Sequence, residues 1–159
     1  MRKFKGGIVI NREIKFRFWD NVINNMYYGE EINKSKNELR HNWYCITKEK
    51  GLIVGNVGPS GMDNYDLIIM QYTGLKDING KEIYEGDILN IEIKDKTIGN
   101  KIIASSNEVV EYKDCKFGVV WGWHRDFTGL DGFYNTTFEV IGNVYEDPKL
   151  SQEDKHEEK

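Results

Sequence analysis

The stretch from Gln71 to Leu89, QYTGLKDINGKEIYEGDIL, limits what this chain can fold into more than any other part. Asn79-Gly80 is the dipeptide best suited to a two-residue β-hairpin loop, because both central residues of a type I′ turn need positive φ. The apolar run Leu67–Met70 before it has the composition and length of a buried strand. Gly86 is expected at a sharp bend, with positive φ or in a bulge. The stretch therefore predicts β-structure that turns back on itself.

Alternating apolar and polar residues on both sides of this stretch predict strands with one buried face. Leu89, Ile91 and Ile93 alternate with polar residues after the bend, and Arg12–Trp19 alternates near the start of the chain. In the first strand we expect Ile14, Phe16 and Phe18 to face the core, and Glu13, Lys15, Arg17 and Trp19 to face solvent. A turn over Asp20–Asn25 and a return strand at Met26–Tyr28 would complete an N-terminal hairpin.

Further strands are expected at His41–Ile46, Leu52–Val54, Glu108–Tyr112, Phe117–Trp123 and Phe138–Tyr145. In the strand Phe117–Trp123, alternate glycines leave one face open to the close approach of another backbone. Asp95–Asn107 is expected to be an irregular excursion anchored by Ile102-Ile103, and Glu30–Leu39 is a short helix or a loop. The pattern predicts a mainly β fold: antiparallel strands in a strongly bent sheet or an SH3-like barrel, with an N-terminal hairpin and at most one short helix. A sandwich is the alternative.

The length of 159 residues suits one domain. We expect an N-terminal extension at 1–11, a β domain at 12–150 and a disordered charged tail at 151–159. Cys45 and Cys115 lie far apart without a C-x-x-C motif, which argues against a metal cluster. No apolar run approaches the roughly 18 residues of a membrane span. We therefore expect a cytoplasmic protein with reduced thiols that needs neither a metal nor another cofactor and binds no membrane.

Few residues in the sequence suggest catalysis. Asp77 and Asp87 lie at turns, where an aspartate caps backbone amides. His124, Arg125 and Asp126 are consecutive, so on a strand they point to alternate faces and do not converge on one substrate. The Gly-rich segment Gly55–Asn64 lacks the Gly-Lys-Ser/Thr ending of a phosphate-binding loop. We expect a protein that is not an enzyme; a hydrolase that uses Asp87, His124 or Asp126 is the least supported alternative.

Aromatic residues crowd a loop-rich segment near the end of the chain, and Trp and Tyr often anchor interfaces. The candidate binding residues are Trp121, Trp123, His124, Arg125 and Tyr134. Core packing of most of these rings is the competing interpretation. Nucleic-acid binding by a β-barrel is a second hypothesis, because basic residues in the first strand accompany Phe16, Phe18 and Trp19. The formal net charge of −4 does not favour it.

Three separated motifs resemble the YopX-like proteins encoded by phages and prophages of Gram-positive bacteria. They are MQYTGLKDINGKEIYEGDIL at 70–89, REIKFRFWD with the later Met26-Tyr27-Tyr28, and FEVIGNVYEDP at 138–148. The resemblance implies a mainly β domain from a mobile element, without an established activity and without catalytic residues to transfer. Taken with the residues, it predicts a non-catalytic binding or assembly module that forms a homo-oligomer or binds a phage or host protein.

Overall fold

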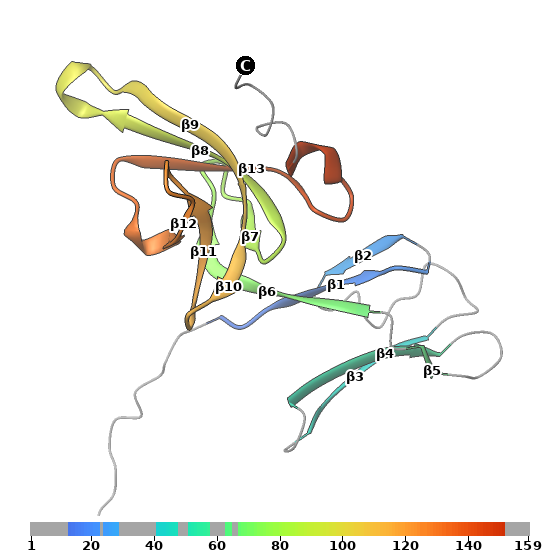
Figure 1. Ribbon diagram of the computed structural model, residues 1–159. Helices are drawn as coiled ribbons and strands as arrows, with labels where there is room; N and C mark the ends of the chain where they lie inside the picture. The colour runs from blue at the N-terminus through green and yellow to red at the C-terminus, as the bar shows by residue number, and fades with distance from the viewer. Residues whose placement is uncertain are drawn as a thin grey trace, which may run out of the picture.

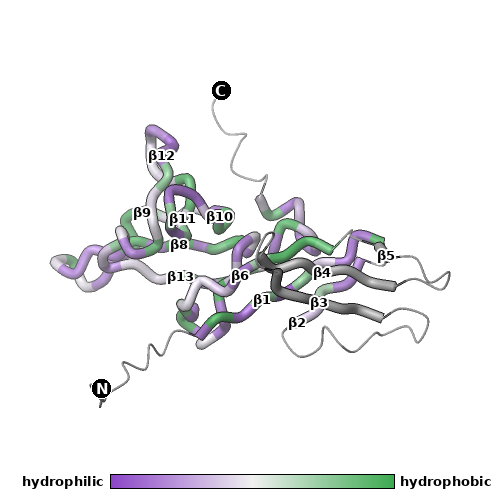
Figure 2. Tube along the Cα trace, turned by 90° about the horizontal axis from the view of Figure 1, so that it is seen from below, coloured by the Kyte–Doolittle hydropathy of each residue, from purple (hydrophilic) through white to green (hydrophobic). Residues whose placement is uncertain are grey.

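The computed structural model describes residues 13–22, 24–28 and 67–151, together with the backbone of three strands within 41–64. The strands are antiparallel and form two groups that lie side by side and are joined by β6 (Leu67–Lys76), as Figures 1 and 2 show. The first group contains β1 (Phe16–Asp20), β2 (Asn25–Tyr28), β3 (His41–Thr47), β4 (Gly51–Val57) and β5 (Asp63–Asn64). The second group contains β7 (Glu82–Tyr84), β8 (Asp87–Asp95), β9 (Lys101–Val109), β10 (Glu111–Lys113), β11 (Lys116–Trp121), β12 (Asp126–Gly129) and β13 (Thr136–Asn143).

The N-terminal hairpin predicted from the alternating pattern is confirmed, and it adds to the sheet through β6. β1 pairs with β2 on one side and with the first half of β6 on the other. Both faces of this sheet are covered, one by a cluster around Phe18 and the other by a cluster around Trp19. The prediction that Arg17 and Trp19 face solvent is therefore wrong. Arg17 is 2% exposed and Trp19 is 6% exposed, since Tyr145 from the far end of the chain packs on their face.

The turn at Asn79-Gly80 forms at the predicted place but is not of type I′. The Gly80 N–H donates to the Asp77 carbonyl at 3.0 Å, and the Asp77 N–H donates to the Lys81 carbonyl at 2.8 Å. Gly80 has a φ of 80°, whereas Asn79 does not have positive φ. This is the pattern of a three-residue loop, a turn followed by a left-handed glycine. The Asp77 carboxylate favours the wider loop because it accepts the N–H groups of both Asn79 and Lys81.

A two-residue loop with positive φ at both positions does occur, between β10 and β11. Asp114 has a φ of 52° and Cys115 a φ of 61°, and Lys113 and Lys116 pair on either side. Cys115 is an exposed free thiol there. Positive φ at both loop residues, the geometry predicted for Asn79-Gly80, thus occurs at Asp114-Cys115 instead.

The second group of strands is a strongly curled half-barrel, which confirms the predicted mainly β fold with a strongly bent sheet. Gly86, with a φ of 80°, makes the predicted bend between β7 and β8. Its N–H donates to the Val110 carbonyl at 2.9 Å, and its carbonyl accepts from Val144 at 3.0 Å. β8 then pairs with β13 on one side and β9 on the other. The half-barrel encloses a core of Ile83, Leu89, Ile91, Val110, Val119, Leu130 and Val140.

The prediction of an irregular excursion at Asp95–Asn107 is wrong, because β8 and β9 form a paired hairpin there, with one register shift between Ile93 and Lys94. A 3-10 turn, η2 (Lys96–Ile98), is capped by the Asp95 carboxylate and followed by Gly99 at a φ of 73°. Ile102 and Ile103 are 47% and 59% exposed, so they do not anchor the segment. Within the described residues the helical elements are η2, η3 (Leu130–Gly132) and η4 (Pro148–Ser151). The segments 1–11, 30–39 and 152–159 lie outside the described residues, so their predictions stay predictions.

A candidate binding surface beside the β11–β12 hairpin

The segment that carries the predicted binding residues is a tight hairpin made of β11 and β12. Trp121 pairs with Asp126, and the loop between them is closed by a hydrogen bond from the Arg125 N–H to the Gly122 carbonyl at 3.1 Å. Gly122 has a φ of 79° and Arg125 a φ of 54°, a tight reversal that ends the strand at Trp121. Trp123, predicted as the last residue of this strand, therefore lies in the loop.

The glycine face predicted for this strand is present at Gly118 only, because Gly122 lies in the loop. A Cβ on Gly118 would lie 2.4 Å from the carbonyl oxygen of Thr128 on β12. Since real Cβ atoms do not approach a backbone oxygen so closely, only glycine fits at this position without a shift of the hairpin.

Core packing and solvent exposure divide the three aromatic candidates. The Trp121 ring meets Phe133 edge-on at 5.4 Å, Phe133 meets Phe138 at 5.6 Å, and all three pack against the half-barrel core. Trp123 is 88% exposed and Tyr134 is 82% exposed. The competing interpretation of core packing therefore holds for Trp121, whereas Trp123 and Tyr134 present their rings to solvent.

Arg125 connects the hairpin loop to β9. Its Nη1 and Nη2 donate to the two carboxylate oxygens of Glu108 at 2.8 and 3.2 Å. Glu108 is 6% exposed, and its Oε1 also accepts a hydrogen bond from the Ser106 hydroxyl at 2.6 Å. This forked geometry is the strong, orientation-specific form of the Arg–carboxylate pair. It neutralises both charges and holds the loop in place against β9.

A groove of about 330 Å³ lies between this hairpin and β9. Its described lining consists of Ala104, Ser105, Ser106, Glu108, Trp121, Gly122, Trp123 and Arg125. Among the described strands only β8 pairs with β9, so β9 is an edge strand. The β8–β9 hairpin projects from the body of the half-barrel (Figure 1), and it carries the exposed side chains of Ile98, Ile102 and Ile103.

The structure brings three of the five predicted binding residues together, since Trp121, Trp123 and Arg125 all line the groove. His124 is exposed in the same loop, and Tyr134 is exposed beyond β12, but neither is among the lining residues. Sequence reasoning missed the β9 side of the groove because it predicted an irregular segment there. The signal that could have found it is Gly99-Asn100, a turn dipeptide between two runs that pair as strands.

The carboxylates considered for catalysis are engaged in structural contacts. Asp87 is 1% exposed, and its Oδ1 lies 2.7 Å from Arg17 Nη1 while its Oδ2 accepts from the Tyr84 N–H at 2.7 Å. Asp77 caps the turn described above, as its position predicted. In the part of the chain that the structure describes, no three His, Cys, Asp or Glu side chains gather as a metal site. Nor does any helix there have the length and apolarity to cross a membrane.

Comparison with known proteins gives the same fold and one family. Among solved structures, the YopX protein of Bacillus subtilis superposes with a TM-score of 0.53 at 23% identity, over 86% of this chain and 96% of that one. Protein EF1440 from Enterococcus faecalis has a TM-score of 0.48 at 25% identity, over 87% and 97% of the two chains. Curated protein sequences yield no match. A family model described as YopX protein matches residues 15–152, and the chain therefore belongs to the YopX family.

Proposed function

We propose that this protein is a non-catalytic binding module of a phage or prophage, which takes up an extended polypeptide strand along the edge of β9. One observation carries the proposal: an edge strand of nine residues lies beside a groove whose rim is an indole that is 88% exposed. The phage setting, and with it the bacterial cytoplasm, rests on the resemblance of the sequence motifs to phage-encoded relatives.

The chemistry of the β9 edge suits a strand as ligand. Unpaired N–H and C=O groups of an edge strand form hydrogen bonds with any extended chain laid alongside, and neighbouring pockets then select its side chains. Ile102 and Ile103 offer apolar contact next to this edge, at 47% and 59% exposure. Trp123 supplies the kind of large, rigid ring that anchors many protein interfaces. The lining of the groove carries no net charge, because Arg125 and Glu108 neutralise each other.

Nucleic-acid binding receives less support from the described residues. The first strand was its main basis, but Phe18 and Trp19 are 4% and 6% exposed and do not form a stacking surface. Arg17 is paired with Asp87, and Lys15 is bonded to both Glu13 and Glu82. Phosphate binding needs cations that exchange counterions with the nucleic acid, and these cations are already matched by carboxylates.

A hydrolytic function is also less well supported than binding. His124 and Asp126 are exposed in the hairpin, while Asp87 is buried in an ion pair with Arg17. A catalytic base needs a nucleophile within hydrogen-bond reach and a third group that orients it. No such hydrogen-bonded chain links these three residues in the part of the protein that the structure describes.

The test compares the wild type with Trp123→Ala, Ile103→Lys and Tyr134→Ala. Tyr134 is the matched control, because it is a similarly exposed ring that does not line the groove. Light scattering after size exclusion detects a strand contributed by a second copy, and affinity capture from prophage-induced cells detects one contributed by a phage or host protein. Trp123→Ala and Ile103→Lys should lower affinity more than about tenfold, as loss of a central anchor does, while folding stability changes by less than about 0.5 kcal/mol.

The outcomes separate the alternatives. Tyr134→Ala should bind as the wild type does. A wild-type protein that stays monomeric and captures no protein would refute the strand-binding proposal, as would equal losses in Trp123→Ala and Tyr134→Ala. Capture of nucleic acid that weakens steeply with added salt would favour the second hypothesis instead.

A further inference from the structure

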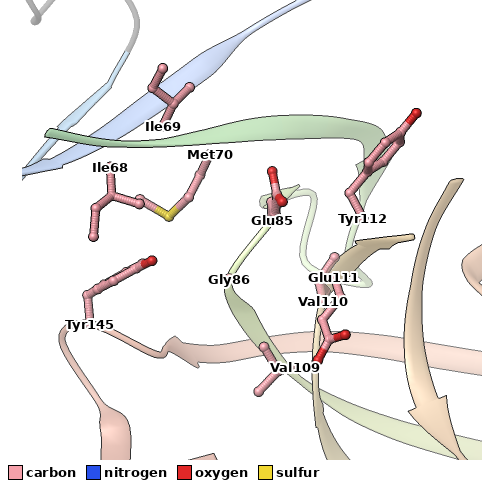
Figure 3. A pocket seen from close by; sticks show the side chains of 10 residues that line it. All are labelled: Ile68, Ile69, Met70, Glu85, Gly86, Val109, Val110, Glu111, Tyr112 and Tyr145. Atoms are coloured by element: carbon pink, nitrogen blue, oxygen red, sulfur yellow. The ribbon is translucent and has the colours of Figure 1, made fainter. Parts of the chain in front are cut away.

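A second groove, of about 400 Å³, lies where the sheet of β1, β2 and β6 meets the half-barrel (Figure 3). Its volume falls within the range of about 300–1,000 Å³ that is usual for small-ligand sites. The described residues that line it are Ile68, Ile69, Met70, Glu85, Gly86, Val109, Val110, Glu111, Tyr112 and Tyr145. They come from β6, the β7–β8 bend, the β9–β10 corner and the segment after β13, and none of them lines the groove beside Trp123.

Most side chains along this groove are apolar, two are carboxylates, and the ring of Tyr145 is backed by a second aromatic ring. Tyr145 and Tyr112 stand at opposite ends, with Met70 and Glu85 between them, in Figure 3. The Tyr145 ring stacks on Trp19 with centroids 5.6 Å apart and planes inclined by 23°. A Cβ on Gly86 would come within 3.3 Å of the Met70 sulfur and 3.6 Å of the Tyr145 ring. Glycine at the bend therefore leaves room between the methionine and the tyrosine.

The charge of the groove has one sign. Glu85 and Glu111 bring carboxylates to it, and none of its described lining residues is basic. Among the described ion pairs neither carboxylate has a cationic partner; Glu85 accepts only a long bond from the Gln71 N–H at 3.4 Å. Burial and the charge of Glu85 raise the pKa of the Tyr145 hydroxyl, while the charge of the buried Arg17 lowers it, and the net pKa is raised. The Glu85 carboxylate therefore acts on the ring at the end of the groove. In the groove beside Trp123, by contrast, Arg125 neutralises the carboxylate.

We propose that this groove binds an Arg or Lys side chain carried by an apolar segment of a partner protein. The alkyl stem would lie on Ile68 and Met70 while the charged head reaches the Glu85 carboxylate, as long basic side chains do along apolar surfaces. The face of Tyr145 adds attraction for a cation. This site is separate from the β9 edge and does not depend on the function proposed for it.

Methyl-labelled methionine provides a direct readout, because Met70 lines the groove, whereas Met26 belongs to the same buried cluster but does not line the groove. The probes are three blocked pentapeptides, Gly-Ile-X-Ile-Gly, with arginine, its neutral isostere citrulline, or glutamate at X. The arginine peptide should move the Met70 methyl resonance saturably and move Met26 much less. The citrulline peptide should bind several-fold more weakly and the glutamate peptide not at all.

Two variants of equal charge change test the role of the carboxylate. Glu85→Gln keeps an acceptor for the Gln71 N–H and should weaken the arginine peptide about five- to tenfold, the usual effect of one partly exposed charged hydrogen bond. Glu111 is exposed and tolerates substitution, and Glu111→Gln should also weaken binding of the arginine peptide. Glu139→Gln, which lies outside the groove, should leave binding unchanged.

Three results would overturn the proposal. The Met70 resonance could fail to move with the arginine peptide, the citrulline peptide could bind as tightly as the arginine peptide, or Glu139→Gln could weaken binding as much as Glu85→Gln does. Trp123→Ala should have no effect on these titrations. Failure of the Arg/Lys-binding proposal therefore leaves the β9 proposal standing, and failure of the β9 proposal leaves this one standing.

Discussion

Asp77 ties the central turn to β13, and its replacement tests whether this contact holds the half-barrel together. Asp77 is 8% exposed, and its carboxylate accepts three backbone hydrogen bonds. Oδ1 accepts from the N–H groups of Asn79 and Lys81, both at 2.8 Å, and Oδ2 accepts from the Val140 N–H at 3.0 Å. The Val140 bond is buried, whereas Asn79 and Lys81 lie at the surface.

The expected loss follows from which donors water can reach. A buried N–H left without an acceptor costs about 1–3 kcal/mol, so the Val140 group should account for about 2 kcal/mol. Each of the two surface groups can turn to water and should cost about 0.5–1 kcal/mol. Asp77→Ala should therefore destabilise the protein by about 3–4 kcal/mol. Asp77→Asn keeps an oxygen for the two turn donors but presents its NH₂ group to Val140, and should cost about 2 kcal/mol.

Urea unfolding at pH 7 measures both values, with the slope against urea unchanged. Asp95→Ala is the matched control, because Asp95 also caps a turn, bonding the Thr97 N–H at 2.7 Å and hydroxyl at 2.6 Å, but does so in solvent. It should cost far less than Asp77→Ala. Wild-type stability in Asp77→Asn, or equal losses in Asp77→Ala and Asp95→Ala, would refute the reasoning.

The same carboxylate should make stability depend on acid. Burial raises the pKa of Asp77, but the backbone donors of Val140, Lys81 and Asn79 together lower it by more, and the net pKa lies below the ordinary 3.8. The unfolded chain therefore takes up the proton first as pH falls. The stabilisation is complete above about pH 4 and is lost as pH falls through the pKa of the folded protein. The gap in unfolding free energy between wild type and Asp77→Asn should accordingly narrow below pH 4.

Two further changes probe the joint and the hairpin. Asp87→Asn should destabilise by about 3 kcal/mol in urea unfolding, because it leaves the buried Arg17 without its counter-charge, and Arg17→Met should restore part of that loss. If the double variant is no more stable than Asp87→Asn, the pair does not act as a unit. Gly118→Ala should cost about 2–3 kcal/mol, since its Cβ would meet the Thr128 backbone, whereas Gly129→Ala meets only movable side-chain atoms of Asp131 and Lys116 and should cost less. Equal decreases in melting temperature for Gly118→Ala and Gly129→Ala would contradict this expectation.

Two of the places where the chain turns could be predicted from sequence, because a turn's requirements lie within a few consecutive residues. Gly86 bends the chain and Asp77 caps its own turn, both as expected. The type of turn at Asn79-Gly80 could not be read from the dipeptide alone, since Asp77 competes for the same backbone groups. The bond between Asp77 and Val140 joins residues 63 positions apart, and no local pattern pairs them.

Only one of the two walls of the candidate site could be predicted from sequence, because local patterns identify the hairpin but not β9. Trp121 and Trp123 mark the aromatic hairpin in the sequence. Only the structure shows that the ring of Trp121 is packed and that of Trp123 is exposed. The opposite wall of the groove comes from β9, whose polar run Ser105–Asn107 gives little strand signal. It forms a strand because β8 pairs with it over its whole length, which is a tertiary effect that overrides local preference.

The error at β1 shows what the joint between the two groups of strands requires. The alternating pattern predicted one buried face. Trp19 lies among the polar residues of the other face, and a tryptophan at such a position indicates that this face is covered as well. Arg17 lies on that face, paired to Asp87 of β8, and its Nη2 donates to the Glu85 carbonyl at 3.0 Å while its Nε finds no acceptor in the described part of the chain. A buried pair with an unsatisfied donor adds little to stability, so its contribution is better understood as orientation. The hydrogen bond from Arg17 to the Glu85 carbonyl ties β1 to the bend that carries Glu85, one of the residues that line the second groove.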